Sequence, residues 1–398
     1  MATPSPSPTR TQTYLARAAL PNTHPLASFL LQLITIKRTN LCLSADVTTT
    51  SGLLQLAEEV GDSICMLKTH ADIIDDFGER TVRGLRDIAR RKRFLVFEDR
   101  KFGDIGSTVQ KQYTSGPLSI VRWAAITNAH IFPGPAIVEA LHSAAVSAVS
   151  SINASVSTEI STGSPRPSSS SSSLSFSHPD DGSALAQSSD DVKDSNPNLQ
   201  ASTSSPSSRK GSIVRATTIE SRTDHTTSPP PSASASSTQL APLLHAEPST
   251  PAQTAAALTA LGDPPFARGL LLLAQMSSAG NLLTGDYTST CVRMARDHRN
   301  FVLGFIAQQD LNSLPDDNFL VLTPGVSLPP ADSHGEAQSG DGLGQQYRTP
   351  RKVILDEGCD VIIVGRGILG ADDRAAEAER YRVEGWRAYE DRVRHPAP

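Results

Sequence analysis

The chain has 398 residues and a formal net charge of −5, with no long basic tract, so a nucleic-acid partner is not expected. No apolar run reaches the ~20 residues that a membrane-spanning helix needs, and the first residues lack the apolar core of a secretory signal. The four cysteines are scattered, without metal-ligand spacing. We therefore expect a cytoplasmic protein with reduced thiols, long enough for one barrel of about 250 residues plus additions.

Short apolar strands recur along the chain and alternate with helical patterns. Residues 1–12 are predicted to be a disordered tail, and an apolar helical segment at 26–36 precedes the first strand. Near-continuous apolar strands separated by helices predict a parallel sheet covered on both faces, and eight such units predict a (β/α)8 TIM barrel. The expected strands are Asn40–Asp46, Asp62–Lys68, Arg93–Asp99, Trp123–Asn128, Arg268–Met276, Phe301–Gln308, Phe319–Thr323 and Asp360–Gly365.

One long segment interrupts this alternation. Residues 150–262 are rich in Ser, Thr, Pro and Ala and have almost no aromatic side chains. Such a composition cannot bury enough apolar surface to offset the entropy of ordering, so it predicts a disordered insertion. The insertion divides the barrel into a first half at 13–149, with four strands, and a second half at 263–398, with the other four.

The third strand and the loop after it, FLVFEDRKFGDIGST at Phe94–Thr108, change from apolar to charged. Because side chains alternate along a strand, we expect Asp99 and Lys101 on one face, and Asp104 adds a second carboxylate. Opposite charges this close shift each other's pKa values and create a strong local field. A solvated surface network of ion pairs would give the same pattern, so this segment alone does not decide between a site and a surface loop.

Polar residues fall at or just after the C-terminal end of each expected strand. In a barrel these positions gather on one rim, where active sites are built. One strand with a polar end is uninformative because strands commonly end where they reach water, but eight such ends favour a site. The residues are Asp46, Lys68, Asp99 with Lys101, Asn128, Ser277, Gln308, Thr323 and Arg366.

Several motifs resemble the orotidine 5′-phosphate decarboxylase family, in particular its fungal type. LKTHADI at 67–73 and FEDRKFGDIGST at 97–108 are similar to the family's motifs, and the similarity covers about 14–149 and 266–392. The Ser-rich insertion is outside the usual family pattern, and Gln275 stands where the family often has Glu. Further matching motifs are ITNAH at 126–130, TPGV at 323–326, GQQYRT at 344–349 and VGRGI at 364–368.

The resemblance implies removal of CO2 from orotidine 5′-phosphate to give uridine 5′-phosphate, the last step of de novo UMP synthesis, without a metal or cofactor. Lys101 would donate a proton to C6 of the pyrimidine, within an alternating charge array formed with Lys68, Asp99 and Asp104. Preorganised groups of this kind would stabilise the charge that develops in the reaction. For Asp104, a role as helix N-cap or first-turn acid remains open.

The resemblance also implies a homodimer with shared active sites and a set of substrate contacts. Asp104 and Thr108 would reach the site of the partner subunit, and Ile105 is a further implied substrate contact. Barrels often bind phosphate at the loops after strands seven and eight, which agrees with the late motifs. His70 fits a ligand contact and a packed residue equally well. The remaining implied contacts are Asp46 and Lys68 at the ribose with Thr69 beside them, Ser277 at the pyrimidine, Pro324, and Gln345, Tyr347, Gly365 and Arg366 around the phosphate.

Two other functions fit parts of the sequence. A metal-dependent phosphosugar decarboxylase of the same barrel group would share the D-x-K-x-x-D pattern, although GQQYRT and Ser277 favour a pyrimidine ligand. A non-catalytic scaffold that uses the Ser-rich insertion for docking would tolerate the loss of Lys101. The complete set of polar residues at the strand ends favours an enzyme.

Overall fold

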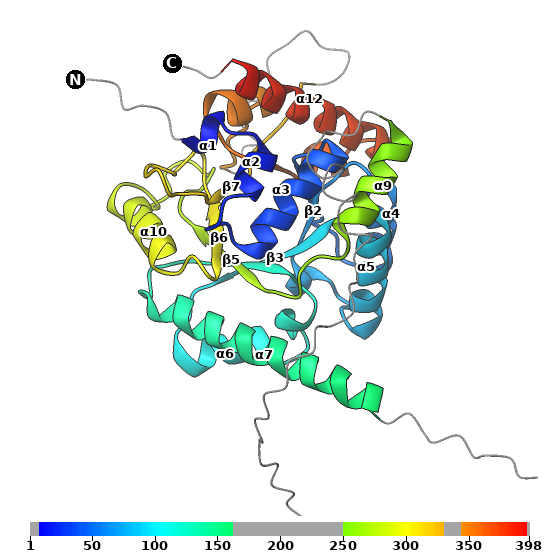
Figure 1. Cartoon of the computed structure of the whole chain (residues 1–398), viewed down its shortest axis with the longest axis vertical. Helices are drawn as coiled ribbons and strands as arrows, with labels where there is room; N and C mark the ends of the chain where they lie inside the picture. The colour runs from blue at the N-terminus through cyan, green and yellow to red at the C-terminus, as the bar shows by residue number, and fades with distance from the viewer. Residues whose placement is uncertain (1–7, 162–249, 330–343, 396–398) are drawn as a thin grey trace, which may run out of the picture. The chain divides into compact units, whose positions relative to one another are not determined.

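The computed structural model of the chain describes residues 8–161, 250–329 and 344–395. Eight parallel strands form a closed barrel in which each strand pairs with the next and the last pairs with the first (Figure 1). The predicted (β/α)8 barrel is therefore confirmed. The strands are β1 (Leu41–Ser44), β2 (Met66–Thr69), β3 (Leu95–Phe102), β4 (Ile126–Ala129), β5 (Gly269–Leu273), β6 (Val302–Ile306), β7 (Leu320–Thr323) and β8 (Val361–Val364).

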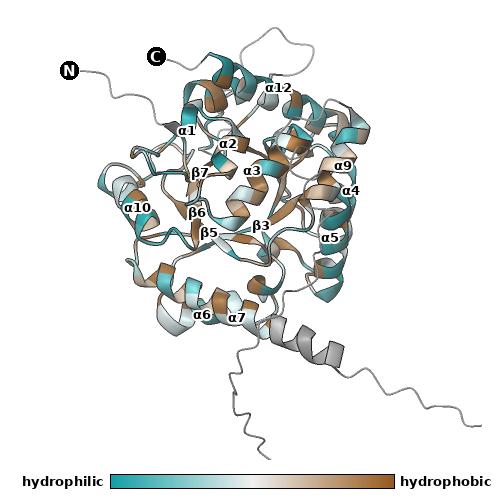
Figure 2. Ribbon diagram, viewed as in Figure 1, coloured by the Kyte–Doolittle hydropathy of each residue, from teal (hydrophilic) through white to brown (hydrophobic). Residues whose placement is uncertain are grey.

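Helices surround the barrel and turn their polar faces outward, while the strands are apolar (Figure 2). Strands such as β5 and β8 are buried along their whole length, because one face fills the barrel and the other packs on helices. The helices that follow strands or cover the barrel are α3 (Pro25–Lys37), α4 (Thr50–Val60), α5 (Glu79–Lys92), α6 (Gly106–Thr114), α7 (Ala136–Ser161), α9 (Pro251–Leu261), α10 (Asp286–Asp297), α11 (Arg366–Leu369) and α12 (Arg374–Arg394).

Shorter elements complete the part of the chain that the structure describes. They are α1 (Pro8–Thr11), α2 (Tyr14–Ala18), the 3-10 turns η1 (Ala71–Ile73) and η2 (Ile120–Arg122), and the π-helical turn η3 (Lys352–Asp356). None of the helices in the described residues is long and apolar enough to cross a membrane.

The first helices close the end of the barrel at which the strands begin. Arg17 is 1% exposed and forms a buried ion pair with Asp360, the residue before β8. Tyr14 stacks on Tyr389 with 4.0 Å between the ring centroids, which ties α2 to α12. The predicted tail at 1–12 is wrong for Pro8–Thr11, which are helical, and its first seven residues lie outside the described residues.

The boundaries predicted for the insertion are also wrong at both ends. The helix α7 continues to Ser161, and α9 lies at Pro251–Leu261, where it packs on α3. Thr250 and Gln253 form a capping box, in which each side chain accepts a hydrogen bond from the other's backbone N–H. This helix was not predicted because the composition of the segment, rich in Ala and Thr, resembles that of the rest of the insertion. The rest of the predicted disordered segment, 162–249, lies outside the described residues.

Candidate active site

A bulge at the end of β3 brings the first two charged residues together. The register with β4 shifts between Glu98 and Phe102. Lys101 has a φ of 50°, in the left-handed backbone region that residues other than glycine rarely adopt. Lys101 Nζ lies 2.7 Å from Asp99 Oδ1. The prediction that these two side chains share a face is confirmed, but the bulge produces the arrangement, not regular alternation along a strand.

Asp99 is the centre of a hydrogen-bonded charge array. Its carboxylate is 2.8 Å from Lys68 Nζ and 3.0 Å from His70 Nε2, and it accepts a 2.7 Å hydrogen bond from Asn128 Nδ2. Burial raises the pKa of Asp99, but the Lys68 ammonium, the bond to His70 and Lys101 outweigh it, and the pKa falls well below its usual range. Asp99 is therefore ionised at neutral pH, between two ammonium groups.

His70 lies between two carboxylates. Its Nδ1 is 2.9 Å from Asp46 Oδ1, and its Nε2 faces Asp99. Burial lowers the pKa of His70, but the hydrogen bonds to Asp46 and Asp99 raise it by a larger amount. The pKa of His70 is therefore raised above its usual value. Burial likewise raises the pKa of Asp46, whereas His70 and Lys68 lower it, to about 2. His70 does not line the cavity described next, which favours a packed role over a ligand contact.

A cavity of about 240 Å³ opens where the strands end. The charge array lies where β1 to β3 end, and residues of the loops after β5, β7 and β8 complete the lining. The structure therefore brings together most of the residues predicted from the sequence. Those that line the cavity are Asp46, Lys68, Asp99, Lys101, Ser277, Pro324, Gln345, Tyr347, Gly365 and Arg366.

The far end of the cavity is built from glycine-containing backbone and neutral side chains around one guanidinium. Arg366 begins α11 directly after β8, and its guanidinium carbon lies 5.6 Å from the centroid of the Tyr347 ring. Gly325 has a φ of 78°, and a Cβ there would collide with the Gln345 side chain. The backbone of Gln346 donates to the Ser277 carbonyl at 3.2 Å, which joins the two loops.

Some predicted residues lie outside the cavity. Thr69 is 1% exposed and its hydroxyl faces Glu98, so its side chain does not line the cavity. Asp104 accepts hydrogen bonds from the Ile105 backbone and from Gln112 Nε2. Ile105 is 56% exposed, and Thr108 is exposed on α6. Because Ile105 is the residue that caps α6, the N-cap and first-turn roles for Asp104 are wrong.

Two residues that contribute to the array were not among the predicted site residues. Asn128, on β4, donates to Asp99 and accepts the Lys101 backbone N–H at 2.7 Å, so it holds both ends of the bulge. Its place at a strand end was a usable signal. Glu98 is fully buried, and burial raises its pKa to about 7. Gln275, in place of the family's usual Glu, lines the cavity and accepts the Gln308 backbone N–H at 2.8 Å.

The arrangement can stabilise and protonate a carbanion-like centre while Arg366, in the same cavity, holds an anion. An ammonium and a carboxylate in fixed contact need little reorganisation as charge develops nearby. Within the described residues, no three His, Cys, Asp or Glu side chains are grouped so that they could hold a metal ion. The fold and the site define a (β/α)8-barrel enzyme whose strand ends carry a Lys–Asp–Lys array.

Comparison with known proteins identifies the group within this class. The chain belongs to the family described as "Orotidine 5'-phosphate decarboxylase / HUMPS family", whose model matches residues 39–161 and 232–381. An orotidine 5′-phosphate decarboxylase of Aureobasidium pullulans is 45% identical over 382 residues, 96% of this chain and 94% of the relative. One of Hypocrea atroviridis is 42% identical over 406 residues, 97% and 98% of the two chains.

A solved structure of orotidine 5′-monophosphate decarboxylase from Methanocaldococcus jannaschii, complexed with the inhibitor BMP, is also similar. It has 14% identity and a TM-score of 0.42, and the match covers 87% of this chain and 98% of that one.

The length of the relatives shows how the insertion is distributed among similar chains. The family model leaves out residues 162–231, which agrees with an insertion into the family's pattern. Both alignments with the Aureobasidium and Hypocrea relatives nevertheless cover at least 94% of each chain, so these relatives have chains of similar length. A long additional segment is therefore not peculiar to this chain.

Proposed function

We propose that this chain decarboxylates orotidine 5′-phosphate to uridine 5′-phosphate, the last step of de novo UMP synthesis, without a metal or organic cofactor. The observation that carries the proposal is the Lys68–Asp99–Lys101 array, which lines one cavity together with Arg366. Membership of the family supports the same reaction. The four cysteines are free and buried, which supports a cytoplasmic location.

Lys101 supplies the proton in the proposed mechanism. When the bond between C6 and the carboxyl carbon breaks, CO2 leaves and the electron pair stays on C6. The Lys101 ammonium stabilises this pair and donates a proton to C6, which gives uridine 5′-phosphate, and the amine then regains a proton from solvent. Asp99 is in contact with Lys101 and ionised, so it favours the protonated ammonium and fixes its position.

The remaining cavity residues hold the nucleotide. Asp46 and Lys68 bind the ribose hydroxyls, and Ser277 contacts the pyrimidine edge beside Pro324. A phosphate accepts several hydrogen bonds, and the planar fork of a guanidinium donates several in a fixed geometry. The phosphate contacts in this proposal are Arg366, Gln345, Tyr347 and the backbone at Gly365.

The enzyme in this proposal is a homodimer with shared sites, to which Asp104, Ile105 and Thr108 contribute across the interface. All three lie outside the cavity of their own chain. The loops after β3, β4 and β5 also expose apolar side chains, with Ile105 at 56%, Phe132 at 67% and Leu282 at 88%. Apolar side chains gathered on the loops of one rim are typical of a surface that another subunit covers.

A hybrid experiment tests the shared site. Lys101→Ala and Asp104→Ala are each inactive in this proposal, but a mixed dimer has one site with both residues intact. Random exchange makes half of the dimers mixed, and each has one working site of two, so activity should return to about a quarter of the wild-type value. No recovery after subunit exchange has been verified, for example with two different affinity tags, would argue against sharing.

An absorbance assay with orotidine 5′-phosphate, run with and without EDTA, tests the reaction itself. The proposal expects turnover that EDTA does not change. Turnover that disappears with EDTA and returns with a divalent cation would favour a metal-dependent mechanism. A folded chain that leaves orotidine 5′-phosphate unchanged would defeat the proposed function.

A further inference from the structure

A buried carboxyl group lies directly behind the charge array. Glu98 is 0% exposed and precedes Asp99, so its side chain points away from the barrel interior. Its carboxylate accepts hydrogen bonds from Thr69 Oγ1 at 2.7 Å and from the backbone N–H of Ala71 at 3.0 and 3.2 Å. Both donors belong to the end of β2 and the turn that follows it.

The two bonds lie on either side of His70 and directly after Lys68. Lys68 and His70 both contact Asp99, whereas Thr69 and the Ala71 N–H face the opposite way and meet Glu98. Glu98 and Thr69 are also direct partners in the register of β2 and β3. One carboxylate therefore fixes the backbone on both sides of His70, which in turn spans Asp46 and Asp99.

Glu98 is also the last residue in regular register with β4 before the bulge. Its carbonyl accepts a 3.0 Å hydrogen bond from Thr127 Oγ1, and the shift of register begins immediately afterwards. The backbone of Glu98 thus anchors the start of the segment that carries Asp99 and Lys101, while its side chain anchors the segment that carries Lys68 and His70.

We infer that Glu98 is a positioning residue, which holds the Lys68–His70 segment of β2 against the Asp99–Lys101 bulge of β3. It does not touch the cavity, so it acts only through the residues that it holds. This inference rests on the proposed function for its kinetic part, and on the geometry of the array alone for its spectroscopic part.

Thr69 can form a hydrogen bond with either Glu or Gln at position 98. Its hydroxyl lies 3.5 Å from the Phe97 carbonyl as well as 2.7 Å from Glu98. With Gln at position 98, the amide can donate to Thr69, Thr69 can donate to Phe97, and the amide oxygen can accept the Ala71 N–H. Glu98→Gln should therefore preserve the position of the turn, whereas Glu98→Ala removes its anchor.

Four proteins make the test: wild type, Glu98→Gln, Glu98→Ala and the control Asp317→Ala. Asp317 is a second buried carboxylate, before β7, which accepts the backbone N–H groups of Ser313 and Leu314 and pairs with Arg296 and Arg299. Asp317→Ala therefore measures how much the loss of a buried carboxylate outside the array changes the kinetics and the His70 signals. Each protein is assayed for kcat and KM, and the side-chain N–H signals of His70 are recorded by NMR.

The inference expects Glu98→Ala to lower kcat/KM by about tenfold to a hundredfold, the scale of effect of a small misplacement of catalytic groups. Glu98→Gln should restore most of this loss. The His70 signals that report its bonds to Asp46 and Asp99 should change in Glu98→Ala and persist in Glu98→Gln and in Asp317→Ala.

Three results would overturn the inference. One is a folded Glu98→Ala with kcat/KM within about twofold of wild type, well below the effect of a misplaced catalytic group. A second is a set of His70 N–H signals in Glu98→Ala that is unchanged from wild type. This result tests the inference even if the wild type proves inactive on orotidine 5′-phosphate. If Glu98→Ala does not fold, Thr69→Val takes its place, because it removes one of the two bonds, and unchanged His70 signals there would contradict the inference.

Discussion

The two ends of the cavity are built in opposite ways. At the ends of β1 to β3, two ammonium groups, two carboxylates and the His70 ring pair with one another through contacts of 2.7 to 3.0 Å. At the β7–β8 end, the Arg366 guanidinium stands over the Tyr347 ring beside glycine-containing backbone. The first end is built from paired opposite charges, and the second is built around a cationic side chain.

This difference indicates how the work is divided. Groups that are already held by each other lose little freedom when charge develops beside them, which suits the chemical step. Groups arranged around an anion gain most of their bonding when the ligand arrives, which suits binding, although remote binding energy also contributes to the rate. Substitutions at Asp99 and Lys101 should lower kcat, and substitutions at the second end should mainly weaken affinity.

The largest effect is expected at Lys101. Lys101→Ala removes both the proton donor and the cation beside C6, so kcat should fall by about 10⁴-fold or more while the protein stays folded. The decrease in absorbance of orotidine 5′-phosphate measures the rate, and circular dichroism measures folding. Lys352→Ala, at an exposed lysine paired with Asp356, is the matched control and should retain full activity. Near-normal turnover of purified Lys101→Ala would refute the mechanism.

A smaller loss is expected at Asn128, which belongs to the first end without being charged. Asn128→Ala removes the donor to Asp99 and the acceptor of the Lys101 backbone N–H, so the bulge is less well held. We expect kcat/KM to fall about tenfold to a hundredfold, mostly through kcat. Asn22→Ala, at an exposed asparagine, controls for the substitution. A change confined to KM would place Asn128 with the binding end.

The charged end should also make stability depend on pH. Burial raises the pKa of Glu98 to about 7, so the folded protein holds this proton more tightly than the unfolded chain does. The stability from this proton is complete below the unfolded pKa, about 4.3, and is lost as the pH rises through 7. Glutamine has no proton to lose.

Glu98→Gln should therefore gain stability relative to wild type as the pH rises. The difference in the free energy of unfolding should change by roughly 2–3 kcal/mol between about pH 5 and about pH 8. Urea denaturation at the two pH values measures it. A constant difference would show that Glu98 does not titrate in this range.

The smallest effect is expected from deleting residues 162–249. The ends of this segment, α7 and α9, contribute no residue to the cavity. A short Gly/Ser linker between them should leave kcat/KM within about twofold, because the cost of closing a loop depends only weakly on its length. A folded, dimeric deletion protein that has lost activity would show that the segment takes part in the reaction.

Sequence patterns predicted the barrel because its strands are short, almost wholly apolar and evenly separated by helices. They predicted both ends of the cavity because Lys68, Asp99 and Arg366 lie at or just after the expected ends of strands. The bulge at Lys101 could not be predicted, since it depends on the register between β3 and β4. The position of the Thr69 side chain outside the cavity could have been predicted, because alternation along β2 puts Lys68 and Thr69 on opposite faces. The helix at 251–261 was missed because composition was weighed above its capping residues.

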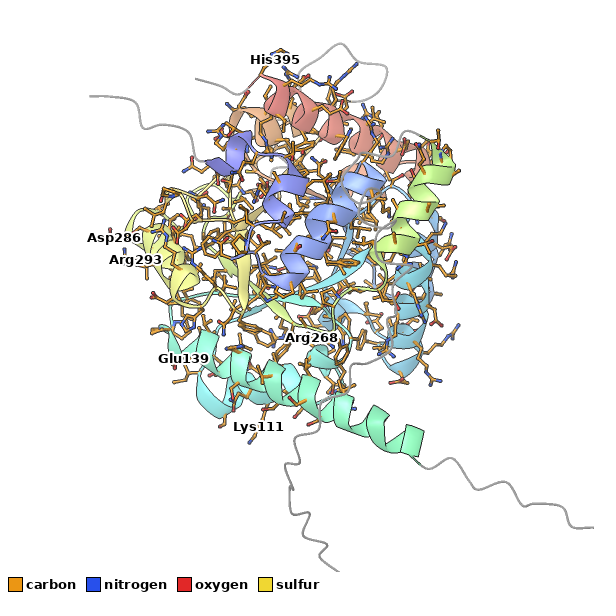
Figure 3. The ribbon with its side chains drawn as sticks, in the orientation of Figure 1. Lys111, Glu139, Arg268, Asp286, Arg293 and His395 are labelled. Atoms are coloured by element: carbon orange, nitrogen blue, oxygen red, sulfur yellow. The ribbon has the colours of Figure 1, made fainter. Side chains whose placement is uncertain are left out.

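The affinity for uridine 5′-phosphate, measured by calorimetry in Lys101→Ala and Arg366→Ala side by side, tests the division between the two ends most directly. Arg293→Ala, an exposed arginine on the outside of α10 (Figure 3), is the control. Arg366→Ala should lose about a hundredfold in affinity, the scale of a lost charge-assisted contact, whereas Lys101→Ala should stay within about tenfold of wild type. Equal losses in the two variants, or the larger loss in Lys101→Ala, would contradict the account.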